Sequence, residues 1–230
     1  MPVDAKTILL VDRTKFGSEF TNILEGLLTG EAPTDDRVAA QEAMVNMKNQ
    51  LDRSPRFGVK LFPERMVGNS LTGAFPNPLS WQDLERLCTS MSCDAVVALE
   101  IFDTDFIVTN GTRIKKKTEG EGASKREVEY TEYYAEGVGN IKMGIRTYYP
   151  KTKNIVDQQL ISENNRWEAV GKNATDAAAL LINKSRANSE LAAMVGRKYA
   201  RKIAPMPVSD RKSTRLNSSH IPLSRMPSSA

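Results

Sequence analysis

The chain has 230 residues and a formal net charge of +4, a length typical of one domain of ordinary size with appendages. Hydrophobic residues make up 40% and charged residues 26%, and no apolar run approaches the roughly 18 residues that span a bilayer, which argues against a disordered polyelectrolyte and a membrane-spanning protein. Two cysteines and one histidine exclude a disulfide scaffold and any site that needs two imidazoles.

The composition changes abruptly at Asp210, after which six serines follow without apolar periodicity. Residues 210–220 and 224–230 match, codon by codon, the in-frame translation of the two constant parts of a common short-read sequencing adapter. Such extraneous residues are excluded from fold reasoning. We therefore expect one domain over residues 1–208, truncated at both ends, and a non-native disordered tail over 209–230. Without residues 210–230, the chain has 28 basic and 27 acidic side chains and no histidine, which excludes histidine-dependent nucleophilic catalysis and histidine-ligated zinc.

Strands and helices alternate in the first hundred residues. Residues 7–11 form a continuous apolar run, typical of a strand buried on both faces. The next apolar residues have helical spacing, and they are Ala40, Met44, Met47 and Leu51. Residues 57–62 alternate as a second strand does. Ser80, with Asp83 three residues on, predicts the capped start of a second helix, and residues 95–102 predict a third strand.

The second half has a different pattern. Residues 109–128 are polar and contain three glycines, which predicts a long exposed hairpin loop. Residues 129–167 predict an antiparallel meander, with a turn over 150–154. A final helix runs from about Ala174 towards Ile203, either continuous or broken near Asn188, and ends at Pro205.

These elements predict an α/β (α+β) fold. Its mixed sheet contains an N-terminal strand-helix-strand-helix-strand unit, followed by an antiparallel meander and a C-terminal helix. Strands that alternate with helices favour right-handed crossovers, which place the helices against the sheet.

Four carboxylates form the sharpest catalytic candidate: Asp12 follows the first strand, and Glu100, Asp103 and Asp105 surround the end of the third. Carboxylates at neighbouring strand ends could hold a divalent metal or divide acid and base roles. Acidic residues also commonly end strands, and neither a general acid nor a phosphate-binding loop accompanies these. We therefore assign no catalytic, cofactor-binding or metal-binding residue.

Three further features allow more than one interpretation. Residues 26–31 contain two glycines but lack the lysine of a phosphate-binding loop, which favours a turn over a phosphate site. Acidic residues surround Lys115, Lys116 and Lys117, so we expect a solvated segment and no nucleic-acid partner. Cys88 and Cys93 are either buried thiols or a disulfide, depending on the compartment. The aromatic residues of the meander either pack in the core or form an exposed partner-binding row, and they are Tyr130, Tyr133, Tyr134, Tyr148, Tyr149 and Trp167.

Specific sequence motifs resemble an uncharacterised family of bacterial envelope lipoproteins. The matching segments read ILLVDRT at 8–14, NILEGLLTGE at 22–31, LDRSPRF at 51–57, FPNPLSW at 75–81, DAVVALEIFD at 94–103 and YARKIAP at 199–205. The resemblance extends over residues 2–208. It implies a lipoprotein signal before the first strand and tetratricopeptide-like helices after residue 205. The strand order also resembles the curli-secretion lipoprotein, the lipoprotein activators of penicillin-binding proteins and the amino-terminal domain of TolB.

The resemblance implies no activity, so we hypothesise a non-enzymatic cell-envelope module in the periplasm or at the outer membrane. A missing lipidated amino terminus would anchor it, and it would bind another envelope protein or assemble with itself. The expected recognition surface is the loop at Thr29, Gly30 and Glu31, with Arg13 and Arg37 as ion-pair or anion contacts. Two alternatives are a metal-assisted hydrolase that uses the strand-end carboxylates and a cytosolic nucleotide-binding regulator.

Overall fold

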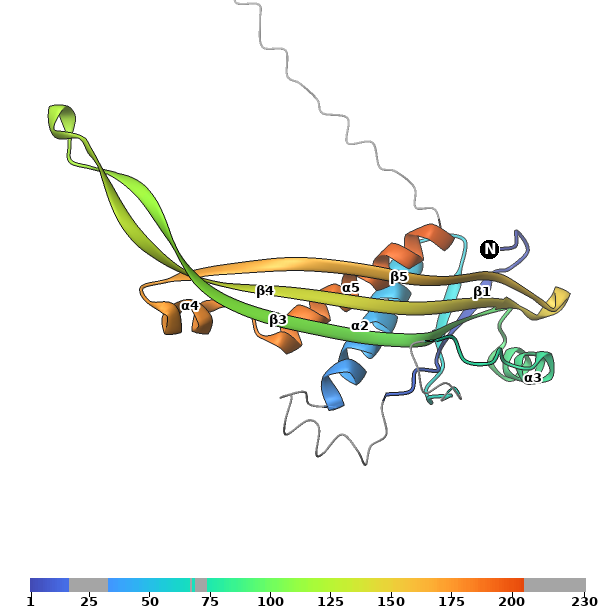
Figure 1. Ribbon diagram of the computed structural model, residues 1–230. Helices are drawn as coiled ribbons and strands as arrows, with labels where there is room; N and C mark the ends of the chain where they lie inside the picture. The colour runs from blue at the N-terminus through green and yellow to red at the C-terminus, as the bar shows by residue number, and fades with distance from the viewer. Residues whose placement is uncertain (17–32, 67, 69–73, 205–230) are drawn as a thin grey trace, which may run out of the picture.

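A computed structural model describes residues 1–16, 33–66, 68 and 74–204, which form a five-stranded mixed sheet with four helices (Figure 1). The strand order is β2-β1-β3-β4-β5. The elements are, in chain order, β1 (Thr7–Asp12), α2 (Pro33–Leu51), β2 (Gly58–Leu61), α3 (Trp81–Met91), β3 (Ala95–Glu119), β4 (Arg126–Tyr149), β5 (Asn154–Gly171), α4 (Ala174–Leu180) and α5 (Lys184–Ile203).

The sheet confirms the predicted fold class. β1 pairs in parallel with both β2 and β3, as helical crossovers require, whereas β3, β4 and β5 form an antiparallel meander. The predicted capped helix is α3, in which the Ser80 hydroxyl accepts a hydrogen bond from the Asp83 backbone N–H. The loop at 29–31 and the segment 205–230, which includes the stretch assigned to an adapter, lie outside the described residues.

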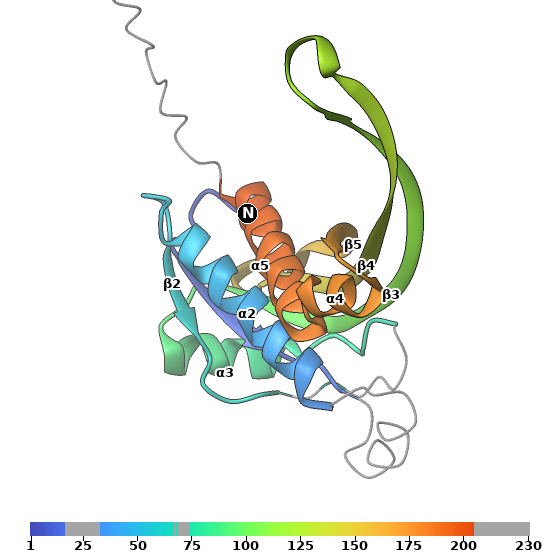
Figure 2. The same ribbon diagram turned by 90° about the vertical axis from the view of Figure 1, so that its left-hand side faces the viewer.

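Helices cover the two faces of the sheet unequally. α2 and α5 lie side by side on one face, and their buried side chains form the main core with β1, β3 and β4 (Figure 2). The predicted apolar stripe of α2 faces this core and includes Ala40, Met44, Met47 and Leu51. On the other face, α3 packs its Leu84 and Leu87 against the amino-terminal part of β3. The remainder of that face, from Ile101 outward along β3, carries no helix among the described residues, and we call it the open face.

Residues 109–128 form an exposed hairpin, as predicted, but the hairpin consists of paired strands and the prediction of a loop is wrong. β3 continues to Glu119, and β4 begins again at Arg126 after a tight turn with Gly120 and Gly122 at positive φ. The segment is polar because both faces of the ribbon meet solvent, and not because it lacks regular structure. Polar side chains of this hairpin pair across the two strands instead of packing in a core.

The break in the C-terminal helix lies earlier than Asn188. α4 ends at Leu180, and Asn183 caps α5 by accepting a hydrogen bond from the Arg186 backbone N–H. Asn188 is fully buried inside α5, where its Nδ2 donates to the Thr104 hydroxyl on β3 at 2.8 Å. Its polar side chain therefore makes a tertiary contact and does not end a helix.

Candidate interaction surface

A buried ionic cluster lies between α3 and the open face, at the carboxyl end of β1. Glu100 occupies a register shift of β3 between Leu99 and Ile101, and its side chain is completely buried. It pairs with Arg13, and the Arg146 Nη1 lies 2.8 Å from Glu100 Oε2. The Tyr148 hydroxyl donates to Glu100 Oε1 at 2.8 Å, and burial raises the pKa of Tyr148, so this hydroxyl remains a donor.

The cluster fastens a loop to the sheet. Arg146 Nη1 donates to the Pro76 carbonyl at 3.1 Å, its guanidinium stacks over the Phe75 ring, and Arg13 Nη2 donates to the Asn77 carbonyl at 3.2 Å. Arg13, expected at the recognition surface, is thus buried in an ion pair. Arg37 is exposed on the first turns of α2 and is not among the residues of this cluster.

The four carboxylates predicted at strand ends do not come together, and β3 continues past three of them to Glu119. Asp12 Oδ1 accepts hydrogen bonds from the Thr14 N–H and hydroxyl, and Asp12 Oδ2 lies 3.3 Å from Arg65 Nε. Glu100 belongs to the buried cluster, and Asp103 and Asp105 are exposed on β3. Within the described ranges, no group of three or more metal-ligating side chains comes together.

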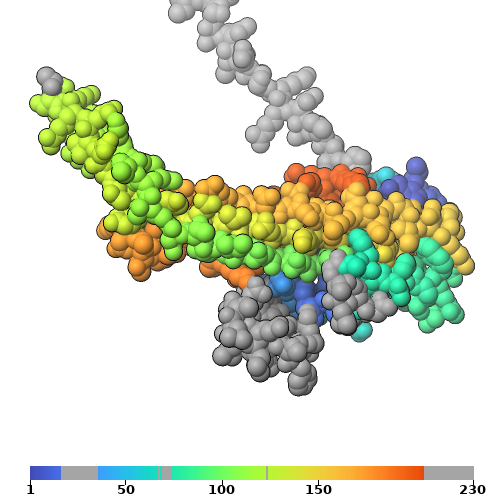
Figure 3. All heavy atoms as spheres, viewed as in Figure 1, coloured from blue at the N-terminus to red at the C-terminus, as the bar shows by residue number. Residues whose placement is uncertain are grey.

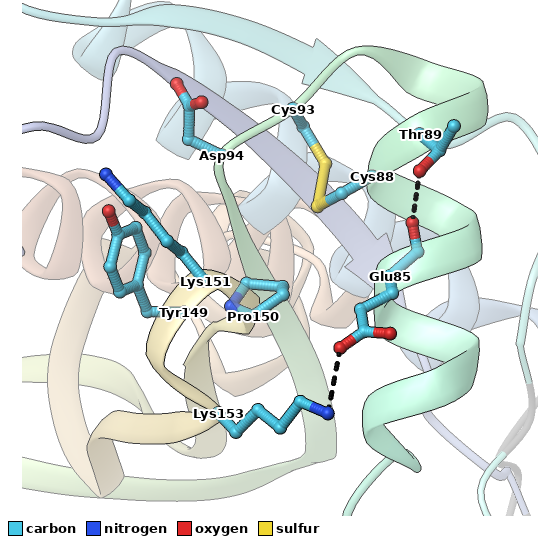
Figure 4. A pocket seen from close by; sticks show the side chains of 9 residues that line it. All are labelled: Glu85, Cys88, Thr89, Cys93, Asp94, Tyr149, Pro150, Lys151 and Lys153. Atoms are coloured by element: carbon cyan, nitrogen blue, oxygen red, sulfur yellow. Dashed lines mark hydrogen bonds and ion pairs between the residues drawn. A yellow bond between two sulfur atoms is a disulfide. The ribbon is translucent and has the colours of Figure 1, made fainter.

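A disulfide joins Cys88, near the end of α3, to Cys93, just before β3. Ser92 between them takes a left-handed conformation, and the Cys93 N–H donates to the Cys88 carbonyl. Figure 4 shows that both cysteines line a shallow surface pocket together with Asp94, Tyr149 and the lysines of the β4–β5 turn. Of the two predicted cysteine states, the structure contains the disulfide.

The β3–β4 hairpin extends beyond the end of β5 as a two-stranded ribbon over residues 112–133, which we call the arm. β5 ends at Gly171, opposite Tyr133 of β4, whereas β3 and β4 remain paired out to Glu119 and Arg126. Figures 1 and 3 show the arm projecting from the body, and Figure 2 shows that it curves as it leaves. An isolated two-stranded hairpin is marginally stable in water, so this ribbon requires support from its side chains.

Charged side chains supply that support at the base of the arm. Arg113 Nε donates to Glu132 at 2.6 Å, and its two terminal nitrogens donate to Glu168 of β5 at 3.0 and 2.6 Å. Lys115 lies 2.8 Å from Glu132, and these contacts, led by the hydrogen bond from Lys115, lower the pKa of Glu132. The Arg113 guanidinium also stacks on Tyr134. The network links all three strands of the meander.

The meander aromatics do not form one row. Tyr148 and Tyr149 are buried, and Trp167 packs on Phe106 on the helix-covered side of the sheet. Tyr130 and Tyr134 instead lie on the open face, where each packs beneath a cation of the arm. The sequence analysis assigned most of the arm to a loop, although basic residues over 113–117 and acidic residues over 127–132 were a usable signal for paired strands.

Comparison with known proteins identifies a family without an assigned activity. A family model described as a domain of unknown function (DUF8603) matches residues 5–212. None of the curated proteins matches the chain. Among solved structures, a neuraminyllactose-binding hemagglutinin homolog from Helicobacter pylori is 12% identical, with a TM-score of 0.28, and the match covers 88% of this chain and 83% of that one. A hypothetical protein from Chlamydia trachomatis is 14% identical, with a TM-score of 0.27 and coverages of 85% and 97%.

Proposed function

The chain belongs to the family described as a domain of unknown function (DUF8603), and from that premise we propose that it is a non-enzymatic cell-envelope protein that binds other proteins through its arm. No enzyme family is indicated by the comparisons. None of the helices in the described part of the chain is long and apolar enough to cross a membrane.

The arm is the observation that carries this proposal. Its residues take no part in the buried core clusters, so it adds little to the stability of the body. It nevertheless holds a regular shape and exposes 72% of Ile114 at a position where a partner could cover it. Sheet edges and projecting strands are common contact elements because a partner can add its own strand to them. An ordered projection outside the core is therefore best explained by binding.

The disulfide supports a location outside the cytoplasm. Disulfides persist in oxidising compartments, including the bacterial periplasm, and are rare in proteins kept in reducing conditions. The resemblance to envelope lipoproteins, carried by the motifs at 8–14 and 94–103, favours the same location. A lipid anchor at an upstream amino terminus would then hold the domain at a membrane without any spanning helix.

The location can be tested by thiol labelling of the full chain in intact cells. We expect Cys88 and Cys93 to resist a maleimide after denaturation and to react once a reductant is added. The variant Cys93→Ser is the control, because its single remaining thiol should react without reductant. Free thiols in the unreduced wild-type chain would contradict export to an oxidising compartment.

Binding can be tested with a photo-crosslinking residue placed at Ile114 of the full chain. We expect adducts with a protein partner from this position on the arm. Val3, which is 93% exposed on the body, is the matched control and should give none. Adducts from Val3 that equal those from Ile114, or none from Ile114, would refute the arm as the contact element.

A further inference from the structure

We infer that the free edge of β3 binds a second copy of this chain, as an antiparallel strand pair centred on Asn110. The inference rests on the proposed protein-binding function and names a partner for it. It follows from three features of β3: an unpaired edge, a separation of charge along the strand, and an apolar pair on the opposite face.

The edge of β3 is open over most of its length. β1 pairs with β3 only as far as Leu99, and no strand among the described residues pairs with this side of β3 from Ile101 to Glu119. Natural proteins protect such edges with charged side chains, above all lysine, or with prolines, bulges or short strands, because an open edge is a template for another chain. Charged side chains are the device present on this edge, so a chain that adds to it must carry complementary charges. This stretch contains no proline, and the register shift of β3 lies before it.

Acidic and basic side chains of β3 occupy separate halves of the strand on its open face. Asp103 and Asp105 lie in the half nearer the body, and their exposed side chains make no ion pair or hydrogen bond with any described residue. Arg113, Lys115 and Lys117 lie in the half nearer the tip. All five positions are odd, so their side chains share one face of the strand.

An antiparallel second copy matches this pattern. With the twofold axis at Asn110, Asp103 lies opposite Lys117 of the second copy, and Asp105 lies opposite Lys115. The twofold axis repeats both contacts, so four cross-copy ion pairs form. Side chains that lie directly opposite each other in an antiparallel pair have Cβ atoms about 4.5–5.5 Å apart, which is within reach of these groups.

The other face of the strand agrees with the same register. Phe106 lies opposite Ile114 of the second copy, and this contact would cover the exposed Ile114 side chain. The outer edge of β5 does not fit in this way, because full-length antiparallel pairing would place Asp157 opposite Glu168. Charge matching therefore favours β3 over β5, and the apolar contact between Phe106 and Ile114 agrees with the same register of a second copy.

A charge exchange tests the pairing. We expect the wild-type chain to sediment as a dimer whose dissociation increases with salt. Asp103→Lys/Asp105→Lys should lose the dimer, and so should Lys115→Glu/Lys117→Glu, in which Glu132 retains Arg113 as its partner. An equimolar mixture of the two variants should restore a heterodimer, because each substituted carboxylate or amine then faces its opposite. Restoration also shows that both variants are folded.

The matched control is Glu64→Lys/Glu85→Lys, which makes the same change in net charge on two exposed carboxylates of the body. It should dimerise as the wild-type chain does. A wild-type chain that stays monomeric at every concentration, or a mixture that fails to associate, would overturn the inference. Adducts between Ile114 and a different protein would in that case leave the proposed function standing.

A cysteine at the axis tests the register independently. Asn110→Cys places the same residue of two copies opposite each other, so oxidation should give a covalent dimer. Thr118→Cys lies opposite Phe102 of the second copy in this register and should remain uncrosslinked under the same conditions. Equal crosslinking at the two positions would rule out a strand pair centred on Asn110.

Discussion

At the residue scale, Glu100 is the counter-charge that two buried arginines share. It is the one carboxylate that contacts both Arg13 and Arg146, and Nε of Arg13 has no hydrogen-bond partner among the described residues. Burying charge is costly unless each group is paired, and breaking such a pair leaves the other charge stranded. The cluster therefore makes the attachment of the 75–79 loop to the sheet depend on a single carboxylate.

We expect Glu100→Gln to lower the free energy of unfolding by about 3 kcal/mol, because it leaves two guanidinium groups buried without a counter-charge. Chemical denaturation measures this. Glu119→Gln, which changes a charge near the tip of the arm, should alter stability by less than about 0.5 kcal/mol. A loss of similar size in the two variants would contradict the role given to Glu100.

Asp4 gives the molecule a defined response to acid. Hydrogen bonds from Lys151 and then from Tyr149 lower the pKa of Asp4 from 3.8 to about 2. A carboxyl whose pKa is depressed in the folded state binds fewer protons there than in the unfolded chain between these values. Its contribution to stability is therefore complete above the unfolded pKa and is lost as the pH falls from about 4 towards 2.

A carboxyl titration followed by NMR should place the midpoint of Asp4 near 2. Lys151→Gln should return this midpoint towards 3.8, because it removes the strongest cause of the shift. The melting temperature of Asp4→Asn should fall less between pH 4 and pH 2 than that of the wild-type chain. A wild-type midpoint at the ordinary value would refute the contact between the amino-terminal segment and the β4–β5 turn.

At the scale of elements, the contact between α2 and α5 depends on the absence of one side chain. A Cβ at Gly196 of α5 would lie well inside van der Waals contact of the Ala43 carbonyl oxygen, and therefore against backbone that cannot rotate away. The facing helix presents small residues, Ala39, Ala40 and Ala43, which are all buried. The two helices can thus approach closely, and Gly196 is tolerated in a helix for this reason.

We therefore expect Gly196→Ala to lower the free energy of unfolding, which is the opposite of the usual effect of this substitution in a helix. Alanine in place of glycine normally stabilises a helix by about 1 kcal/mol, but here we expect a loss of about 2 kcal/mol from overpacking. Thermal unfolding distinguishes a gain in stability from a loss. Gly58→Ala is the control, since a Cβ there meets nothing within 4 Å and should be neutral or mildly stabilising. Stabilisation by Gly196→Ala would mean that the helices lie further apart.

At the scale of the whole molecule, the body and the arm have different sources of order. The body is held by three clusters of buried side chains, whereas residues 112–133 contribute to none of them. The arm is instead held by backbone pairing and by the ion pairs of Arg113 and Lys115. The two parts should therefore be separable.

Replacing residues 112–133 by Asn-Gly, a two-residue turn suited to hairpins, should leave the body folded. Gly111 and Tyr134 already pair directly, so the turn closes strands that are in register. We expect the free energy of unfolding to change by less than about 1 kcal/mol, because no side chain of the core clusters is lost and Arg113, Lys115 and their buried partner Glu132 are removed together. Global unfolding of this variant would show that the arm is part of the folding unit.

The sequence by itself determined the elements whose apolar periodicity is strong. The buried run at 7–11, the helical stripe from Ala40 to Leu51, the Ser80 cap and the alternation in β4 each follow from local rules, because one face or the whole strand must be hidden from water. These rules also yielded the fold class. The match to a domain of unknown function over residues 5–212 likewise rests on sequence alone, without any knowledge of contacts.

Only the tertiary structure decided what the polar residues do. Local pattern cannot distinguish a polar loop from a polar ribbon, because the difference lies in the cross-strand partners of Arg113 and Lys115. Nor could it show that Arg13 is buried against Glu100, or that Asn188 bonds to Thr104 within a helix. Periodicity in the sequence predicts which apolar side chains are buried, whereas the position of a polar side chain depends on a specific partner that lies far away in the sequence.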